Sequence, residues 1–102
     1  MEALRFEWDQ AKNLSNQRKH GVSFEKASAV FFDPLYVAVQ ERIEDGEPRW
    51  QTLGMVEDLL LLTVSHTVRE ESDEGTAVEV IRIISARQAT RKERRRYEDE
   101  NG

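Results

Sequence analysis

Hydrophobic side chains recur along this chain with two different periods, and the shorter period marks five predicted strands. Apolar and polar residues alternate in some of these stretches, while others are almost continuously apolar. The predicted strands are residues 4–8, 35–41, 49–55, 59–67 and 78–87. In the first strand we expect Leu4, Phe6 and Trp8 to face inward. The stretch 59–67 is hydrophobic enough for the middle of a sheet.

Helical periodicity and capping residues predict three helices, of which the first runs from Gln10 to about Lys19. Asp9 can cap its start, and Gly21 can take the left-handed conformation at its end. The residues available for a buried stripe are few: Ala11, Leu14 and the stems of Arg18 and Lys19. We therefore expect docking and capping, more than buried area, to stabilise this helix.

The second and third helices have clearer signals. Ser23 can cap a helix that Asp33-Pro34 ends. Its apolar residues fall on one face: Phe24, Ala27, Val30 and Phe31. Thr90 and Glu93 form a capping box for a third helix over residues 91–97, which is strongly basic and contains neither glycine nor proline.

Short connections join the later strands. Residues 42–48, which include Asp45-Gly46, and residues 56–58 have the composition of turns. Residues 69–77 are acidic, contain Gly75 and lack large apolar side chains, so we expect a mobile loop there. Because hairpins join antiparallel neighbours, the sequence predicts one α+β domain over residues 1–102. Its sheet is mainly antiparallel, two N-terminal helices pack on one face, and a basic helix ends the chain.

The net charge of −5 at pH 7 argues against a nucleic-acid partner when it is averaged over the whole chain. The distribution of charge reverses this inference. Residues 41–79 carry 11 acids against 3 bases, whereas residues 82–97 carry seven bases and one acid. A polyanion meets the local field of a surface, so the basic end can attract one. The alternative is that both segments are ordinary solvated faces.

Other features of the composition exclude several classes of protein. The chain has no cysteine, so it has neither disulfides nor thiolate metal sites, and the cytoplasm is its expected location. The longest apolar run is far too short to span a membrane. Residues 1–11 lack the apolar core segment of a signal peptide. The two histidines, His20 and His66, are far apart in the sequence. No metal site and no cofactor are predicted.

Two blocks of residues, one near each end, form a recognisable motif. The C-terminal block comprises Arg82-Ile83-Ile84-Ser85-Ala86-Arg87, Ala89-Thr90, Glu93-Arg94-Arg95 and Tyr97. The N-terminal block comprises Phe6-Glu7-Trp8-Asp9, Lys12, Asn16, Lys19-His20-Gly21-Val22, Phe24, Ala27 and Phe32-Asp33-Pro34. Together they resemble the BrnT family, the toxin half of a bacterial type II toxin–antitoxin pair. The resemblance implies a RelE-like fold, an endoribonuclease that cleaves messenger RNA and inhibits translation, and a neutralising antitoxin of the BrnA type.

RNA cleavage without a metal needs a group that takes the 2′-hydroxyl proton, cations for the growing phosphoryl charge, and a proton source for the 5′-oxygen. We assign proton transfer to His66, which ends a predicted strand. We assign charge stabilisation to three arginines: Arg69, Arg82 and Arg87. Structural roles are the alternatives. His66 can be an edge residue of the sheet, and Arg69 can pair with acids such as Glu70 and Glu71.

The sequence leaves the relative orientation of these four residues open. Arg82 and Arg87 are five positions apart, so they point to opposite faces unless a bulge or the strand end intervenes. His66 shares a face with Arg82 only if the residue numbers of each pair across the two strands add to an even sum, as they do when His66 lies opposite Val80. Arg87 is the stronger candidate, because either face is reachable at a strand end.

The predicted RNA-binding residues are Lys19, His20, Arg91, Arg94 and Arg95. His20 can instead cap the first helix and interact with its dipole. Single-stranded RNA, free or on the ribosome, is the expected substrate. DNA would be contacted only through the antitoxin, because the chain has no helix-turn-helix signature of its own. No membrane partner is expected.

A function of another class is also open. The chain can be a non-catalytic or degenerate toxin that serves as a protein-binding module in an antitoxin complex and so autoregulates its operon. The acidic segment 70–79, which lengthens the interval between the candidate arginines, motivates this alternative.

Overall fold

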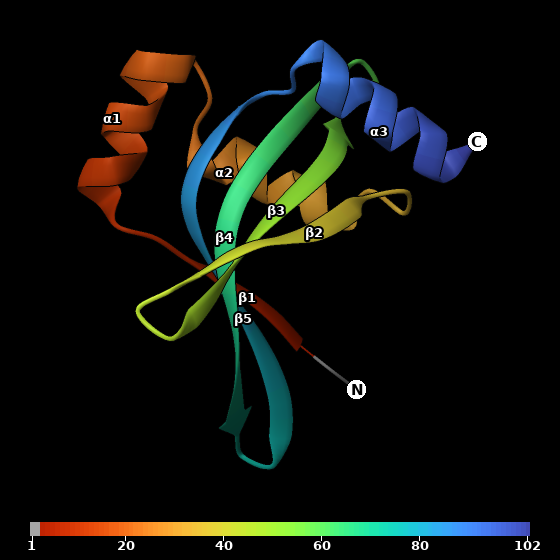
Figure 1. Ribbon diagram of the computed structural model, residues 1–102. Coiled ribbons are helices and arrows are strands. Elements are labelled where there is room, and N and C mark those ends of the chain that lie inside the picture. The colour runs from red at the N-terminus through yellow and green to blue at the C-terminus, as the bar shows by residue number, and fades with distance from the viewer. Residues whose placement is uncertain (1–2) are drawn as a thin grey trace.

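The computed structural model describes residues 3–102 and shows a five-stranded sheet with α-helices on its flanks (Figure 1). In chain order the elements are β1 (Ala3–Glu7), α1 (Gln10–His20), α2 (Phe24–Ala27), the 3-10 helix η1 (Ser28–Phe32), β2 (Val37–Glu44), β3 (Glu47–Val56), β4 (Leu60–Asp73), β5 (Thr76–Gln88) and α3 (Arg91–Asn101). The strands lie in the order β1-β5-β4-β3-β2. The predicted α+β class with a C-terminal helix is confirmed.

Most of the sheet is antiparallel, as predicted. β2 pairs with β3, β3 with β4 and β4 with β5 in antiparallel fashion. β1 pairs with β5 in parallel, from Ala3 opposite Val78 to Glu7 opposite Arg82. The chain reaches the other strands from β1 through helices and not through a hairpin, which permits this parallel pairing. β4 occupies the middle of the sheet, as the hydrophobic stretch 59–67 predicts.

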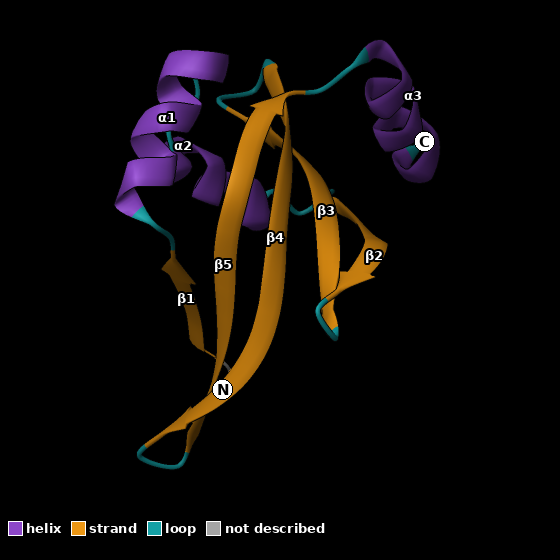
Figure 2. Ribbon diagram, turned by 60° about the vertical axis from the view of Figure 1, so that its left-hand side comes forward, coloured by secondary structure: helices purple, strands orange, loops and turns teal. Residues whose placement is uncertain are grey.

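The two faces of the sheet have separate apolar cores. The α2 face is defined by strand residues buried with α2 and η1: Leu62, Val64, Ile81 and Ile83. Phe24 and Val30 supply the largest helical side chains of that core. The α3 face is defined by strand residues buried with Tyr97 of α3: Leu53 and Leu61. Figure 2 shows α1 and α2 on one side of the strands and α3 on the other.

The layer formed by η1 approaches the sheet closely at Gly54 of β3. A Cβ atom on Gly54 would lie 2.6 Å from Val30 Cγ1 and 2.8 Å from the Val30 carbonyl oxygen. Only glycine permits this approach. Asp33, which follows η1, is thereby held beside β3, where its Oδ2 accepts from the Met55 N–H at 2.7 Å and from the Tyr97 hydroxyl at 2.6 Å. These bonds link η1, the sheet and α3.

Amide side chains, and not an apolar stripe, dock α1. The expectation that Ala11 and Leu14 are buried is wrong, because both are exposed and the buried residues of α1 are Asn13 and Asn16. Asn16 Nδ2 donates to the Ala86 carbonyl at 2.8 Å, and Asn16 Oδ1 accepts from the Ala86 N–H at 3.2 Å. Asn16 thus provides hydrogen-bond partners for backbone groups of β5 that lie beyond its pairing with β1. Buried backbone groups need such partners.

The predicted ends of α1 and the predicted start of α3 are confirmed. The Asp9 carboxylate accepts from two N–H groups in the first turn of α1, and Gly21 follows that helix with a φ of 70°. The capping box of Thr90 and Glu93 starts α3. The third helix continues beyond its predicted end to Asn101. Within the described part of the chain, the helices are all too short or too polar to cross a membrane.

The prediction of a mobile loop at residues 69–77 is wrong. β4 continues to Asp73, β5 begins at Thr76, and the two strands form a paired ribbon. Glu74 and Gly75 make the turn with φ values of 50° and 83°, the conformation of a two-residue hairpin loop. The prediction failed because backbone pairing, and not apolar burial, defines this ribbon.

Two smaller predictions also need correction. Residues 42–48 are mostly strand, since only Asp45 and Gly46 form the turn, with φ values of 54° and 77°. Leu4 shares the face of Phe6 but is not buried, because it lies near the start of an edge strand and is 39% exposed. Phe6, two residues later on the same strand, does pack against the core.

Candidate functional site

A β-bulge brings Arg82 and Arg87 to the same face of the sheet. The register of the β4–β5 pair shifts between Ser65 and His66, where β5 contributes one extra residue, Ile84. The extra residue reverses the alternation of side chains along β5. Both arginines therefore lie on the α3 face, opposite residues of β4 that carry hydroxyl groups. The sequence predicted opposite faces for Arg82 and Arg87 unless a bulge intervened, and this bulge is present.

Arg87 is held by a carboxylate of α3. Its Nη1 and Nη2 atoms donate to Glu93 Oε1 and Oε2 at 2.8 and 3.0 Å, a bidentate pair. Glu93 Oε1 also accepts from Thr63 Oγ1 and from the Thr90 N–H, each at 2.9 Å. The bond from Arg87, with the bonds from Thr90 and Thr63, outweighs burial and lowers the pKa of Glu93 to about 2. Arg87 retains 38% of its side-chain surface in contact with solvent.

Arg69 and Arg82 lie farther down the α3 face in a network with two glutamates. Arg69 donates to Glu7 through Nη1 and to Glu71 Oε2 through Nε at 2.7 Å, and Arg5 also donates to Glu71. Bonds from Arg69 lower the pKa of both carboxyls. Arg82 Nη1, in contrast, lies 3.9 Å from Glu7 Oε1, which is beyond hydrogen-bond distance. The network engages Arg69 through two hydrogen bonds and Arg82 only through the longer contact with Glu7.

His66 lies on the opposite, α2 face. The residue is 3% exposed, its Nε2 is 2.7 Å from Thr52 Oγ1, and its ring packs edge-on against Phe31 with ring centroids 4.8 Å apart. The cavity beside it, of about 170 Å³, is mostly apolar, and its lining includes Trp50 and Tyr36. Burial lowers the pKa of His66 to about 4. The residue numbers of the pair His66–Ile83 add to an odd sum, so the sheet separates His66 from Arg82 and Arg87.

We predict that His66 stays neutral throughout the physiological range. In an NMR titration of the folded protein, its ring signal should be constant from pH 8 to pH 5 and should change with a midpoint near pH 4. In urea the same ring should titrate near pH 6.5. Because the unfolded chain then binds more protons, the free energy of unfolding should fall as the pH is lowered from about 6.5 toward 4. A folded-state midpoint near 6.5 would contradict the burial of this ring.

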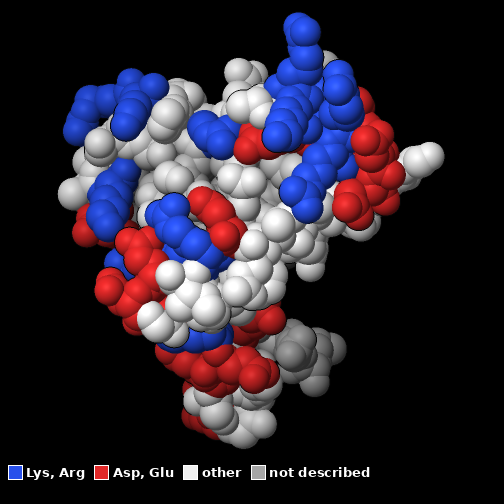
Figure 3. All heavy atoms as spheres, viewed as in Figure 1, with Lys and Arg blue, Asp and Glu red and all other residues white. Residues whose placement is uncertain are grey.

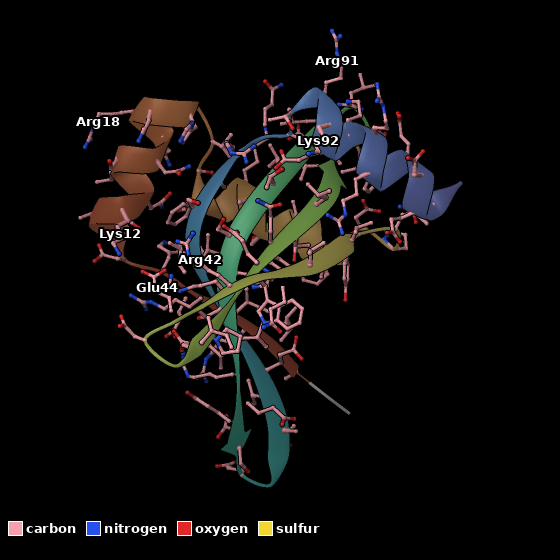
Figure 4. The ribbon with its side chains drawn as sticks, in the orientation of Figure 1. Lys12, Arg18, Arg42, Glu44, Arg91 and Lys92 are labelled. Carbon is pink, nitrogen blue, oxygen red and sulfur yellow. The ribbon has the colours of Figure 1, made fainter. Side chains whose placement is uncertain are left out.

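The predicted RNA-binding residues lie on two helices at one end of the molecule. Lys19 and His20 are exposed at the end of α1 and, with Lys12, line a shallow pocket of about 200 Å³ that reaches Ser85 of β5. The other three are exposed on α3: Arg91, Arg94 and Arg95. Figure 3 shows the Lys and Arg side chains gathered over α1 and over α3, and acidic side chains toward the β4–β5 hairpin. In Figure 4, Lys12 lies at the left beside α1 and Arg91 lies at the top beside α3.

The β2–β3 hairpin adds Arg42 and Arg49 to the α3 face, and neither residue was predicted from the sequence. The two residues pair across that hairpin. The available signal was alternation, because Arg49 is separated by an even number of positions from Leu53, a core residue of the α3 face. Figure 4 shows Arg42 beside Glu44, with which it forms an ion pair at 3.1 Å. Among residues 3–102, no group of three or more His, Cys, Asp and Glu side chains is placed to hold a metal ion.

The α3 face can therefore receive an anion. Arg82 and Arg87 project from one strand opposite the buried residues Thr67 and Thr63 of β4. The two arginines keep 44% and 38% of their side chains exposed. Guanidinium groups in such a position can bind phosphoryl oxygens through paired N–H donors. The basic helices flank this surface and add attraction at longer range.

Comparisons with known proteins agree with this architecture. The family model described as the ribonuclease toxin BrnT of a type II toxin–antitoxin system matches residues 8–93. The crystal structure of the Brucella abortus ribonuclease toxin BrnT is similar, with a TM-score of 0.59 and 20% sequence identity. The match covers 89% of this chain and 99% of that one. At this identity the structural likeness supports the fold alone. No curated protein matches by sequence.

Proposed function

Because the chain belongs to the BrnT family of ribonuclease toxins of type II toxin–antitoxin systems, we propose that it is itself an endoribonuclease that cleaves messenger RNA and so inhibits translation. The observation that carries this proposal is the bulge that gives Arg82 and Arg87 a common face. Two guanidinium groups on one surface suit the dianionic phosphoryl group that forms as RNA is cleaved.

The proposed reaction is a transesterification without cofactor. The 2′-oxygen attacks the adjacent phosphorus and loses its proton, and the bond to the 5′-oxygen breaks as that oxygen gains a proton. The products are a 2′,3′-cyclic phosphate and a 5′-hydroxyl. Single-stranded RNA is the proposed substrate, since an unstacked nucleotide can place its 2′-oxygen in line with the leaving group.

Among the candidate catalytic arginines, Arg82 and Arg87 have the stronger support. Arg82 has 44% of its side chain exposed, and its carboxylate neighbour Glu7 lies 3.9 Å away. Arg87 must share its donors between Glu93 and a phosphate. Arg69 has two carboxylate partners that RNA would have to displace. The assignment of proton transfer to His66 stays a prediction, and the titration above tests whether its ring changes protonation near neutral pH.

The remaining proposals concern partners. The basic residues of α1 and α3 would hold the RNA backbone on both sides of the arginines: Lys19, His20, Arg91, Arg94 and Arg95. An antitoxin of the BrnA type would neutralise the toxin by covering this surface, and the complex would contact DNA through the antitoxin. A RelE-like fold, engagement of the ribosome and action in the cytoplasm complete the proposal.

The direct test is incubation of the purified chain with a single-stranded RNA in the presence of EDTA. We expect fragments that end in 2′,3′-cyclic phosphate, and we expect expression of the chain alone to arrest bacterial growth. Lys26→Gln, on the α2 face, is the charge-matched control and should cleave RNA as the wild type does. Intact RNA together with tight binding of the antitoxin would overturn the nuclease proposal and favour a purely protein-binding role.

A further inference from the structure

Arg49 of β3 has a buried hydrogen-bond donor that nothing satisfies. Its Nε atom is shielded from solvent and has no hydrogen-bond partner among residues 3–102. The carboxylate oxygen of Glu44 lies 3.9 Å away, beyond hydrogen-bond distance, and Glu44 is already engaged by Arg42 at 3.1 Å. A buried donor without an acceptor is costly and rare in folded proteins. An acceptor supplied by a ligand would remove this cost.

The strand register places Arg49 near Arg82. The β3–β4 ladder ends at the pair Trp50–His66, and extending its antiparallel register by one residue sets Arg49 beside Thr67. Thr67 in turn pairs with Arg82 on the other side of β4. Since neighbouring strands are about 4.8 Å apart, the Cα atoms of the two arginines are separated by roughly 10 Å. Thr67, which is buried, lies on β4 between them.

Arg49 and Arg82 differ in their contacts from Arg69 and Arg87. Arg69 and Arg87 donate hydrogen bonds to carboxylates, whereas Arg49 and Arg82 have their carboxylate contacts only at 3.9 Å. Their side chains are partly shielded, with 25% and 44% exposure. Partial shielding strengthens the attraction of a guanidinium for an anion relative to open solvent. Among residues 3–102, Arg49 and Arg82 thus donate no hydrogen bond to a carboxylate.

We propose that Arg49 and Arg82 bind one phosphodiester group of single-stranded RNA between them, above Thr67. The two non-bridging oxygens of a phosphodiester can accept from two guanidinium groups at once. This inference rests on the proposed function, because it takes RNA as the ligand of the α3 face. It assigns a phosphate-binding residue, Arg49, that lies outside the C-terminal strand and helix.

The test uses a short 2′-O-methyl RNA, which has the phosphates of RNA but no free 2′-hydroxyl and so cannot be cleaved. In ¹⁵N-labelled wild-type protein, the Nε–Hε signals of Arg49 and Arg82 should shift as this probe is added. Arg49→Gln should weaken binding about tenfold, the loss expected for one charge-assisted contact. It should also reduce the slope of log affinity against log salt by about 0.7, the value for one phosphate contact on a single strand.

Two further variants distinguish a direct contact between Arg49 and the phosphate from a general effect of protein charge. Lys26→Gln removes one positive charge from the opposite face, where Lys26 pairs with Glu57, and should leave the slope unchanged. Arg49→Lys keeps the charge but loses the planar fork, so its affinity should lie between those of the wild type and Arg49→Gln. The wild-type signal of Arg49 remains informative even if a variant is destabilised.

Each outcome decides the inference. If the wild type binds the probe and neither the Arg49 signal nor the Arg49→Gln slope changes, the inference is overturned while the proposed function stands. If the Arg49 signal shifts but the wild type leaves natural RNA intact, the phosphate site stands and the nuclease proposal falls. If the wild type does not bind the probe at all, the inference is overturned.

Discussion

Arg87→Gln should lower kcat/KM for cleavage of single-stranded RNA by about 100- to 1,000-fold, the usual effect of removing one donor that stabilises transition-state charge. Arg87 sits at the end of β5 on the α3 face and keeps more than a third of its side chain exposed, so a phosphate can reach it. Cells that express the variant should grow when cells that express the wild type do not. The measurements are kcat/KM of the purified variant and the growth of cells that express it.

Glu93→Gln is the matched control for this prediction. Both variants break the bidentate pair between Arg87 and Glu93, but only Arg87→Gln removes the cation. At a temperature where both proteins are folded, Glu93→Gln should therefore cleave RNA at least about tenfold faster than Arg87→Gln. Equal losses in the two variants would show that the pair acts only by holding α3 in place, and that Arg87 does not act on the phosphate.

The elements that local chemistry defines could be predicted from the sequence. The capping box at Thr90 and the glycine after α1 have direct physical meanings, and both are confirmed. The ribbon that includes residues 69–77 could not be found this way, because its strands carry no apolar alternation and are held by backbone bonds to each other. The turn at Glu74-Gly75 was the one local signal for it.

The geometry of the candidate site depends on a feature that the sequence does not mark. Ile83 and Ile84 are chemically alike, so the pattern of residues cannot say which of them is the extra residue of a bulge. That choice decides whether Arg82 shares a face with Arg87 or with His66. The docking of α1 was missed for a related reason. Asparagine normally marks a surface, and Asn13 and Asn16 are buried only because they satisfy backbone groups distant in sequence.

Glu93→Gln should also reduce the free energy of unfolding at pH 7 by about 3 kcal/mol. The lowered pKa of Glu93, about 2 against an ordinary value of 4.5, corresponds to roughly this amount. The side chain is 16% exposed, so solvent screens the pair only partly. The neutral amide cannot accept the charge-assisted bonds from Arg87, and it weakens the capping box of α3. Urea unfolding followed by circular dichroism gives the difference.

The pH dependence of this loss identifies its cause. A folded-state pKa below the unfolded value means that the carboxylate stabilises the fold fully above about pH 4.5 and loses this effect as the pH falls through about 2. The difference between wild type and Glu93→Gln should therefore shrink steadily between these values. Glu98→Gln, an exposed position on the same helix, should change stability by less than about 0.5 kcal/mol at either pH. A difference that is constant from pH 7 to pH 2.5 would mean that packing, and not the charge of Glu93, anchors α3 to the sheet.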